Sequence, residues 1–179
     1  LGLGVNGAAI ATVISQFLSM LFVLWFFLGS KNEFKIFFQK PLVLPYARET
    51  ADYLMNFIKA VKFPRKLKVC FSNSSTNETH ATFRDLGFVS RPDGKFDVYI
   101  AGGLGNKHKL GVKAAEGVEP LKVLYYAKAM VDTFVSYGNY TNRAQSRTRF
   151  LQDTLGIDGL KKAFMEKLDN AFKNEELDI

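Results

Sequence analysis

The chain has 179 residues, which is room for one ordinary domain and an appendage but not for two full domains. It carries 24 Lys and Arg against 17 Asp and Glu, a net charge of +7, so it would attract an anionic cofactor, a polyanion or a membrane surface. The one cysteine, Cys70, excludes a disulfide framework or a cysteine metal site within this chain and fits a reducing, cytoplasmic compartment.

The first part of the chain, residues 1–30, contains no ionisable side chain, and the run from Gly7 to Leu28 is almost continuously apolar. About 20 such residues cross a bilayer as a helix, and the basic residues that follow predict a cytoplasmic flank. The sequence therefore predicts a membrane-inserted helix over residues 7–28 and a basic linker or junction over 31–41. A buried helix of a soluble protein is the alternative.

The stretch "GAAIATVISQ", residues 7–16, resembles a helix of the multidrug and toxic compound extrusion (MATE) transporters. The resemblance covers about the first 40 residues and implies a fragment, because transporters need many spans to line a cavity. A transporter fragment with a soluble, anion-binding tail is therefore one reading of the whole chain.

Residues 42–179 have a different pattern, with charges and turn signals throughout. Helical spacing of apolar residues predicts an amphipathic helix over 45–61, and a short strand follows at 67–72. Two β-rich runs, 88–90 and 96–101, flank the turn sequence "RPDG" and predict a hairpin. Three helices are expected at 118–138, 142–156 and 159–172. This order predicts an α+β domain of a helix, short antiparallel strands and three helices.

Two lysines stand out before the first predicted strand, in "FPRKLKVCFS" (63–72). Lys66 and Lys68 are two apart, so on a strand they share a face, whereas Arg65 and Leu67 point to the other. Either the lysines are solvated residues that protect a sheet edge, or they face an anion. Cys70, in the apolar part of the strand, is expected to be packing.

A glycine-rich turn follows the second hairpin strand in "AGGLGNKHKLG" (101–111). Gly102, Gly103 and Gly105 permit close backbone approach, so their amides could cradle a carboxylate or phosphate, or the segment could be a simple turn. A dinucleotide fingerprint is excluded, because His108 stands where the last glycine of GxGxxG should be.

Three arginines lie in the predicted helix 142–156. Arg143 and Arg147 are four apart and would stack one above the other, with Arg149 further round the axis, so they could grip anionic groups. Nucleic acid is not the expected ligand, because glycines rather than stacking aromatics accompany these cations. His80 and His108 lack neighbouring ligands at metal spacing, so no metal site is expected on them.

Four segments in order, "FPRKLKVCFSNS", "THATFRDLGFV", "KFDVYIAGGLG" and "GNYTNRAQSRTRFLQDTLG", resemble a siroheme-dependent nitrite/sulfite reductase over about residues 42–173. The family's Pro-Arg-Lys-x-Lys strand matches residues 64–68, its His-Ala and Gly-Phe pairs match 80–81 and 87–88, its glycine loop matches 102–105, and its Asn-Arg helix matches 142–149.

This resemblance implies multi-electron reduction of sulfite or nitrite at siroheme coupled to a 4Fe-4S cluster, with electrons from a donor protein or reductase subunit. Lys66 and Lys68 carry over as catalytic, substrate-facing cations. The cofactor-binding candidates are Arg65, Gly102, Gly103, Gly105, Arg143, Arg147 and Arg149. A cluster needs four thiolates and this chain has one cysteine, so the resemblance implies a partial domain that is incomplete for catalysis. A membrane-tethered module that binds anions without catalysis is a further alternative.

Overall fold

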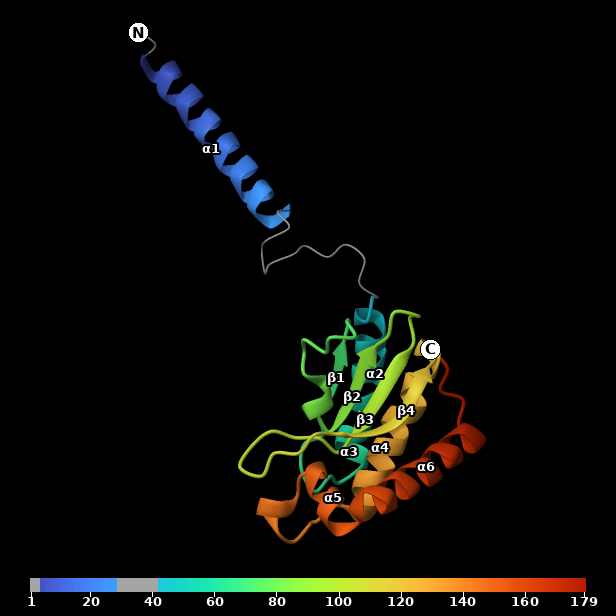
Figure 1. Cartoon of the computed structure of the whole chain (residues 1–179). Coiled ribbons are helices and arrows are strands. Elements are labelled where there is room, and N and C mark those ends of the chain that lie inside the picture. Colours follow the sequence, from blue (N-terminus) through green and yellow to red (C-terminus); the bar gives the residue numbers. More distant parts are fainter. Residues whose placement is uncertain (1–3, 29–41) are drawn as a thin grey trace. The chain divides into compact units, whose positions relative to one another are not determined.

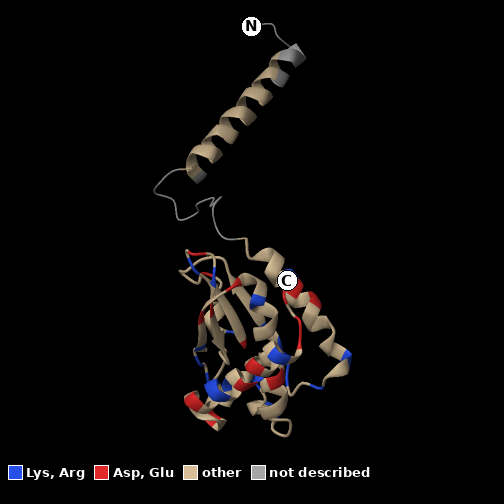
Figure 2. Cartoon of the chain, turned by 90° about the vertical axis from the view of Figure 1, so that its right-hand side faces the viewer, with Lys and Arg blue, Asp and Glu red and all other residues tan. Residues whose placement is uncertain are grey.

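The computed structural model describes residues 4–28 and 42–179, and the chain divides into two compact units, Leu1–Lys40 and Pro41–Ile179. In the first unit, helix α1 (Gly4–Leu28) is drawn in blue in Figure 1. Coloured by charge in Figure 2, α1 carries no Lys, Arg, Asp or Glu. The predicted basic linker over residues 31–41 lies outside the described residues.

The N-terminal helix is present, but its expected role is not supported. Across residues 4–28 and 42–179, no helix combines the length and apolar character that crossing a membrane requires. Within α1, the Ser15 hydroxyl donates to the Thr12 carbonyl at 2.9 Å. The described residues therefore give no support to the membrane-inserted helix predicted over residues 7–28.

The second unit has the predicted α+β character. Its elements are α2 (Leu44–Met55), α3 (Phe57–Ala60), β1 (Val69–Ser72), η1 (Ala81–Phe83), β2 (Leu86–Ser90), β3 (Phe96–Ile100), β4 (Val112–Val118), η2 (Pro120–Lys122), α4 (Val123–Tyr137), η3 (Arg143–Gln145), η4 (Thr148–Phe150), α5 (Leu151–Thr154) and α6 (Gly156–Asn174), where η denotes a short 3-10 helix.

The strands form one sheet in the order β1-β2-β3-β4 (Figure 1). The predicted hairpin is confirmed, because β2 and β3 pair antiparallel with Phe88 opposite Val98. The expectation of antiparallel strands throughout is wrong for β1, which runs parallel to β2. A parallel neighbour needs a crossover connection rather than a tight turn, and residues 73–85 with η1 supply it. Strand β4, antiparallel to β3, was not predicted.

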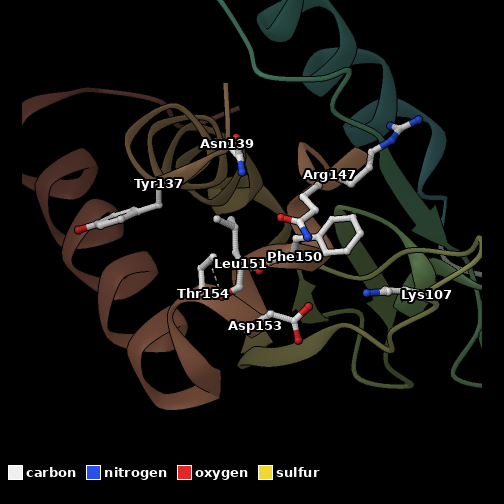
Figure 3. A pocket seen from close by; sticks show the side chains of 9 residues that line it. Lys107, Tyr137, Asn139, Arg147, Phe150, Leu151, Asp153 and Thr154 are labelled. Carbon is white, nitrogen blue, oxygen red and sulfur yellow. Dashed lines mark hydrogen bonds between the residues drawn. The ribbon is translucent and has the colours of Figure 1, made fainter. Parts of the chain in front are cut away.

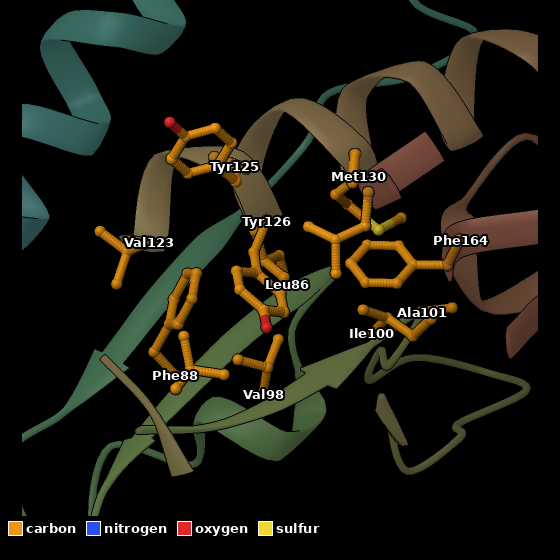
Figure 4. Close-up of a cluster of buried hydrophobic side chains, with 14 of the residues drawn as sticks. Leu86, Phe88, Val98, Ile100, Ala101, Val123, Tyr125, Tyr126, Met130 and Phe164 are labelled. Carbon is orange, nitrogen blue, oxygen red and sulfur yellow. The ribbon is translucent and has the colours of Figure 1, made fainter. Parts of the chain in front are cut away.

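The core lies between one face of this sheet and the helices α4 and α6. Phe96, Val98 and Ile100 alternate with half-buried residues on β3 and point into the core, as a strand's period of two dictates. Figure 4 shows Val98 and Ile100 with side chains of β2, α4 and α6, including Phe88 and Phe164. On β2, Phe88 stacks on Phe71 of β1 at 4.5 Å between ring centroids.

The helices follow the predictions in part. Helices α4 and α6 confirm those expected at 118–138 and 159–172. The helix expected at 45–61 is divided into α2 and α3. The helix expected at 142–156 is wrong as a continuous element, because η3, η4 and α5 replace it. There Asn142 caps η3 by accepting from the Ala144 amide, and the backbone is extended again at Arg147.

An ion-pair network lies on the other face of the sheet. Asp97 of β3 accepts from Arg91 at 3.1 Å, is paired with Lys113 at 2.9 Å and accepts from the Gly117 amide at 3.3 Å. Glu116 also pairs with Arg91, at 2.7 Å. Burial by itself would raise the pKa of Asp97, but the hydrogen bonds from Lys113, Arg91 and Gly117 outweigh it and hold this pKa below its usual value.

We expect Asp97→Asn to lower the free energy of unfolding by about 1 kcal/mol near neutral pH, because asparagine has no negative charge to pair with Arg91 and Lys113. A lowered pKa stabilises the fold above the unfolded pKa, and this contribution is lost as pH falls through the folded pKa. Urea unfolding should therefore show the difference from wild type shrinking below about pH 4. Asp52→Asn, at an exposed acid on α2, is the control, and a difference that persists in acid would contradict the assignment.

Candidate functional site

A strongly basic pocket of about 240 Å³ opens where the sheet meets the segment after α4. Four cationic side chains and a carboxylate come to it from separate parts of the chain, so the pocket exists only in the folded state. The full lining is Lys68, Phe83, Arg84, Asp85, Gly102, Gly103, Leu104, Arg147 and Arg149. We call it the cationic pocket. Such a set of donors suits an oxyanion or several carboxylates.

The buried carboxylate of Asp85 ties the walls of the cationic pocket together. Asp85 is 5% exposed and precedes β2 directly. Its Oδ2 accepts from the Lys68 amide at 2.8 Å, and its Oδ1 accepts a very short hydrogen bond from the hydroxyl of Thr148, which is fully buried. Burial raises the pKa of Asp85, while these hydrogen bonds and the charges of Arg147 and Lys68 oppose the rise.

The glycine loop is shaped first by its own protein neighbours. A Cβ atom on Gly102 would lie 2.7 Å from the Thr82 carbonyl oxygen and 2.8 Å from that of Arg84, so the backbones are too close for any side chain. A Cβ on Gly103 would lie 3.1 Å from Cδ of Arg149, and one on Gly105 would lie 3.4 Å from its Nη2. Gly105 also has a φ of +129°, which favours glycine. The loop therefore makes room for Arg149.

Arg149 lies along this loop and keeps unused hydrogen-bonding capacity. Its Nη1 donates to the Leu104 carbonyl at 3.2 Å, and its guanidinium carbon lies 4.9 Å from the centre of the Phe150 ring. Its Nε is buried and has no hydrogen-bond partner in the protein. A buried donor without a partner is costly, so an acceptor supplied by a ligand would stabilise this arrangement.

A second basic concavity, of about 400 Å³, lies on the segment that precedes β1. It is lined by Phe63, Pro64, Arg65, Lys66 and Arg143. The Nη1 atom of Arg65 is buried without a hydrogen-bond partner, like Nε of Arg149. Arg147 connects the two concavities, because it lines the cationic pocket and donates from Nη1 to the Lys66 carbonyl at 3.1 Å.

A third cavity, of about 240 Å³, also has Arg147 in its lining. Figure 3 shows Lys107 and Asp153 on one side of this cavity, with Phe150 and Arg147 above them. Asp153 forms a very short ion pair with Lys109, which ties the glycine loop to α5. This cavity is less basic than the cationic pocket and was not anticipated from the sequence.

The structure separates the two lysines that the sequence placed on one strand face. Strand β1 begins at Val69, after both of them, so the alternation of a strand does not apply. The Lys68 amide is bound by Asp85, and its side chain lines the cationic pocket, whereas Lys66 lines the second concavity. The prediction that their ammonium groups share a strand face is wrong.

The remaining candidates line the same two concavities, except Gly105, which lies beside Arg149 but lines neither of them. Arg143 and Arg147 do not stack on one helix, because extended backbone at Arg147 separates η3 from η4. Gly102, Gly103, Arg147 and Arg149 meet in the cationic pocket, while Arg65 and Arg143 meet in the second concavity. Sequence reasoning missed Arg84 and Asp85. The signal was the charged pair in "FRDLG", immediately before an apolar strand.

Comparisons of this chain with protein families and with curated proteins point to the same family. The sequence model of the "Nitrite and sulphite reductase 4Fe-4S domain" matches residues 43–172. The NADPH sulfite reductase hemoprotein beta-component of Yersinia pestis (strain Pestoides F) is 35% identical over 112 residues, 57% of this chain and 19% of that protein. The corresponding component of Acidithiobacillus ferrooxidans (strain ATCC 53993 / BNL-5-31) is 29% identical over 115 residues, 59% of this chain and 20% of that protein.

The fold has a similar neighbour among solved structures. The Mycobacterium tuberculosis NirA protein superposes with a TM-score of 0.58 at 23% identity, over 75% of this chain and 25% of that one. The chain thus spans about a fifth of the length of the two curated relatives. The family match begins at residue 43, so it gives no support to the MATE resemblance of residues 1–40.

Proposed function

Because the chain belongs to the nitrite and sulphite reductase 4Fe-4S domain family, we propose that residues 42–179 form part of a siroheme pocket at which sulfite or nitrite is reduced. The observation that carries this proposal is the cationic pocket, in which Lys68, Arg84, Arg147 and Arg149 converge. We also propose that residues 31–41 join two separate parts, 1–30 and 42–179, and that residues 42–179 lie in the cytoplasm. Neither the family match nor the helices of the described residues support a transporter or a membrane-bound protein.

The residues present fit siroheme, one of the two cofactors of the family, but not the other, the 4Fe-4S cluster. Siroheme carries many carboxylates, and the buried, unpartnered atoms Nε of Arg149 and Nη1 of Arg65 are donors that such carboxylates could satisfy. The described residues hold no group of three or more His, Cys, Asp or Glu that could bind a metal ion. A 4Fe-4S cluster needs four ligands, usually cysteines, and this sequence has only Cys70. A 4Fe-4S cluster would therefore need thiolates that this sequence does not contain.

The proposed chemistry assigns separate tasks to the basic residues. Siroheme, when bound, supplies the iron at which a sulfite or nitrite ion takes up electrons that come from a donor protein. Lys68 and Arg147 would hold the oxyanion by charge-assisted hydrogen bonds. Each substrate oxygen leaves as water and needs protons, and the Lys68 ammonium group could donate one. Arg149 would hold a siroheme carboxylate, with Arg65, Lys66 and Arg143 as candidates for further ones.

Expression of the full 179-residue chain with a siroheme supply tests this function. We expect a Soret-type absorption band that copurifies with the protein. Arg149→Ala should weaken siroheme binding at least about tenfold, because it removes a charged donor from the pocket and leaves a carboxylate unpaired. Arg48→Ala, at an exposed arginine on α2, is the charge-matched control and should bind siroheme as wild type does. A folded, colourless wild-type protein would contradict the proposal and favour an anion-binding module without catalysis.

A further inference from the structure

Asp85 is the one acidic residue that lines the cationic pocket, and nothing in the proposed chemistry uses it. The charged side chains around it are Lys68 before β1, Arg84 beside it in the chain, and Arg147 and Arg149 at η4. The glycine loop contributes Gly102, Gly103 and Leu104 to the lining and no charge. The Asp85 carboxyl group therefore lies among four basic side chains.

The hydrogen bonds of Asp85 and its neighbour join three segments of the pocket wall. The Asp85 side chain binds the Lys68 amide and the Thr148 hydroxyl. Its carbonyl accepts from the Ala101 amide at 2.8 Å, and the Arg84 carbonyl accepts from the Gly102 amide at 2.9 Å. The start of β1, the end of β3 and η4 are thus all hydrogen-bonded to Asp85 or Arg84.

The position of Lys68 depends on Asp85 in particular. Residues 66–68 precede the strand, so no strand pairing holds the Lys68 amide, and Asp85 is its acceptor. The Lys68 carbonyl accepts from the amide of Leu86, the residue that follows Asp85, at 3.2 Å. Thr148 lies between Arg147 and Arg149 in the sequence. The carboxylate that binds the Thr148 hydroxyl therefore also fixes the position of the neighbouring Arg147 backbone.

We propose that Asp85 is a positioning residue: its carboxylate holds Lys68 and Arg147 where they can bind one anion together, and its negative charge makes the affinity of that anion depend on pH. The inference deepens the proposed function, because it concerns the same pocket, but it concerns anion binding by this chain and not the loaded enzyme. Protonation of Asp85 removes a negative charge beside the cations, so anions should bind more tightly as pH falls. Burial, which raises the pKa of Asp85, brings this step closer to neutral pH.

Two substitutions separate position from charge. Asp85→Asn has nearly the same shape, and its amide can accept from the Lys68 amide through oxygen and donate to the Thr148 hydroxyl through nitrogen. Asp85→Ala removes the same charge and leaves both groups without their partner. The two variants have equal net charge, so a difference in anion affinity between them reports position alone.

The experiment is calorimetric titration of sulfate into the full chain from about pH 4.5 to pH 8, where sulfate keeps its charge and Lys and Arg stay protonated. At the upper end, we expect Asp85→Asn to bind about fivefold more tightly than wild type. Asp85→Ala should bind about tenfold more weakly than Asp85→Asn. The affinity of wild type should rise as pH falls, and Asp85→Asn should lack this step. Glu49→Gln, an exposed change of the same charge on α2, should behave as wild type.

If Asp85→Ala does not fold, Thr148→Val and Thr148→Ser make the same comparison, because only serine keeps a hydroxyl donor for Asp85. Hydrogen exchange at the Lys68 amide adds a direct readout, with protection retained in Asp85→Asn. Equal sulfate affinities for the paired variants, a pH step that survives in Asp85→Asn, or no sulfate binding by wild type would each overturn the inference. Siroheme loading is measured separately, so failure of the proposed function remains distinguishable.

Discussion

Phe88→Ala should lower the free energy of unfolding by about 3 to 5 kcal/mol, the usual cost of removing a buried aromatic ring. Phe88 is fully buried on β2 and contacts the rings of Phe71 on β1 and Phe96 on β3, with centroids 4.5 Å and 6.0 Å away. Its removal would leave a cavity at the centre of three strands. A domain of this size has about 5 to 15 kcal/mol in total, so much of the stability would be lost.

Chemical denaturation followed by circular dichroism measures this effect. Ile157→Ala is the control, because Ile157 is 56% exposed near the start of α6 and its truncation should cost less than about 1 kcal/mol. If the two substitutions had similar effects, the ring cluster would not be the centre of the core.

Gly102→Ala should both destabilise the protein, by about 3 kcal/mol, and abolish anion binding at the cationic pocket. The new methyl group would meet the carbonyl oxygens of Thr82 and Arg84 at less than 3 Å, and these are backbone atoms that cannot turn aside. The Gly102 amide would be pushed from the Arg84 carbonyl, which it now binds at 2.9 Å. Because Arg84 and Asp85 line the pocket, its walls would separate.

Thermal unfolding and sulfate titration of a glycine series test this expectation. Gly103→Ala should be milder, because its methyl group would meet the side chain of Arg149, which can move. Gly159→Ala is the control: it lies within α6, where the nearest atom would be Cβ of Leu155 at 3.5 Å, and alanine should stabilise a helix there by about 0.5 to 1 kcal/mol. A Gly102→Ala protein as stable as wild type would show that the loop is not closely packed.

Periodicity and turn chemistry determined the parts of this fold that depend on local sequence. The apolar faces of α4 and α6 and the "RPDG" turn between β2 and β3 were predictable, because each pattern specifies its own structure over a few residues. The pattern was misleading in residues 142–156, where a capped turn at Asn142 and extended backbone at Arg147 interrupt a segment with helical spacing. Strand β4 was missed because "VKAAEGV" has neither strong alternation nor many β-branched residues.

The chemical class of the site was also readable from the sequence. Solvated lysine side chains and arginine side chains are charged near neutral pH, so the basic segments indicated an anionic ligand before their positions were known. Their motifs in order pointed to the family that residues 43–172 match.

The tertiary structure decided which of these cations lie together in one pocket. Lys68 joins Arg84, Arg147 and Arg149 because the buried carboxylate of Asp85 draws three distant segments to one point, whereas Lys66 lies in a separate concavity. Such a grouping depends on hydrogen bonds between residues far apart in the chain, such as Thr148 and Asp85, and no local pattern contains that information. The sequence by itself therefore determined the charge of the site and the family, and only the packing of the sheet against η4 determined the pocket.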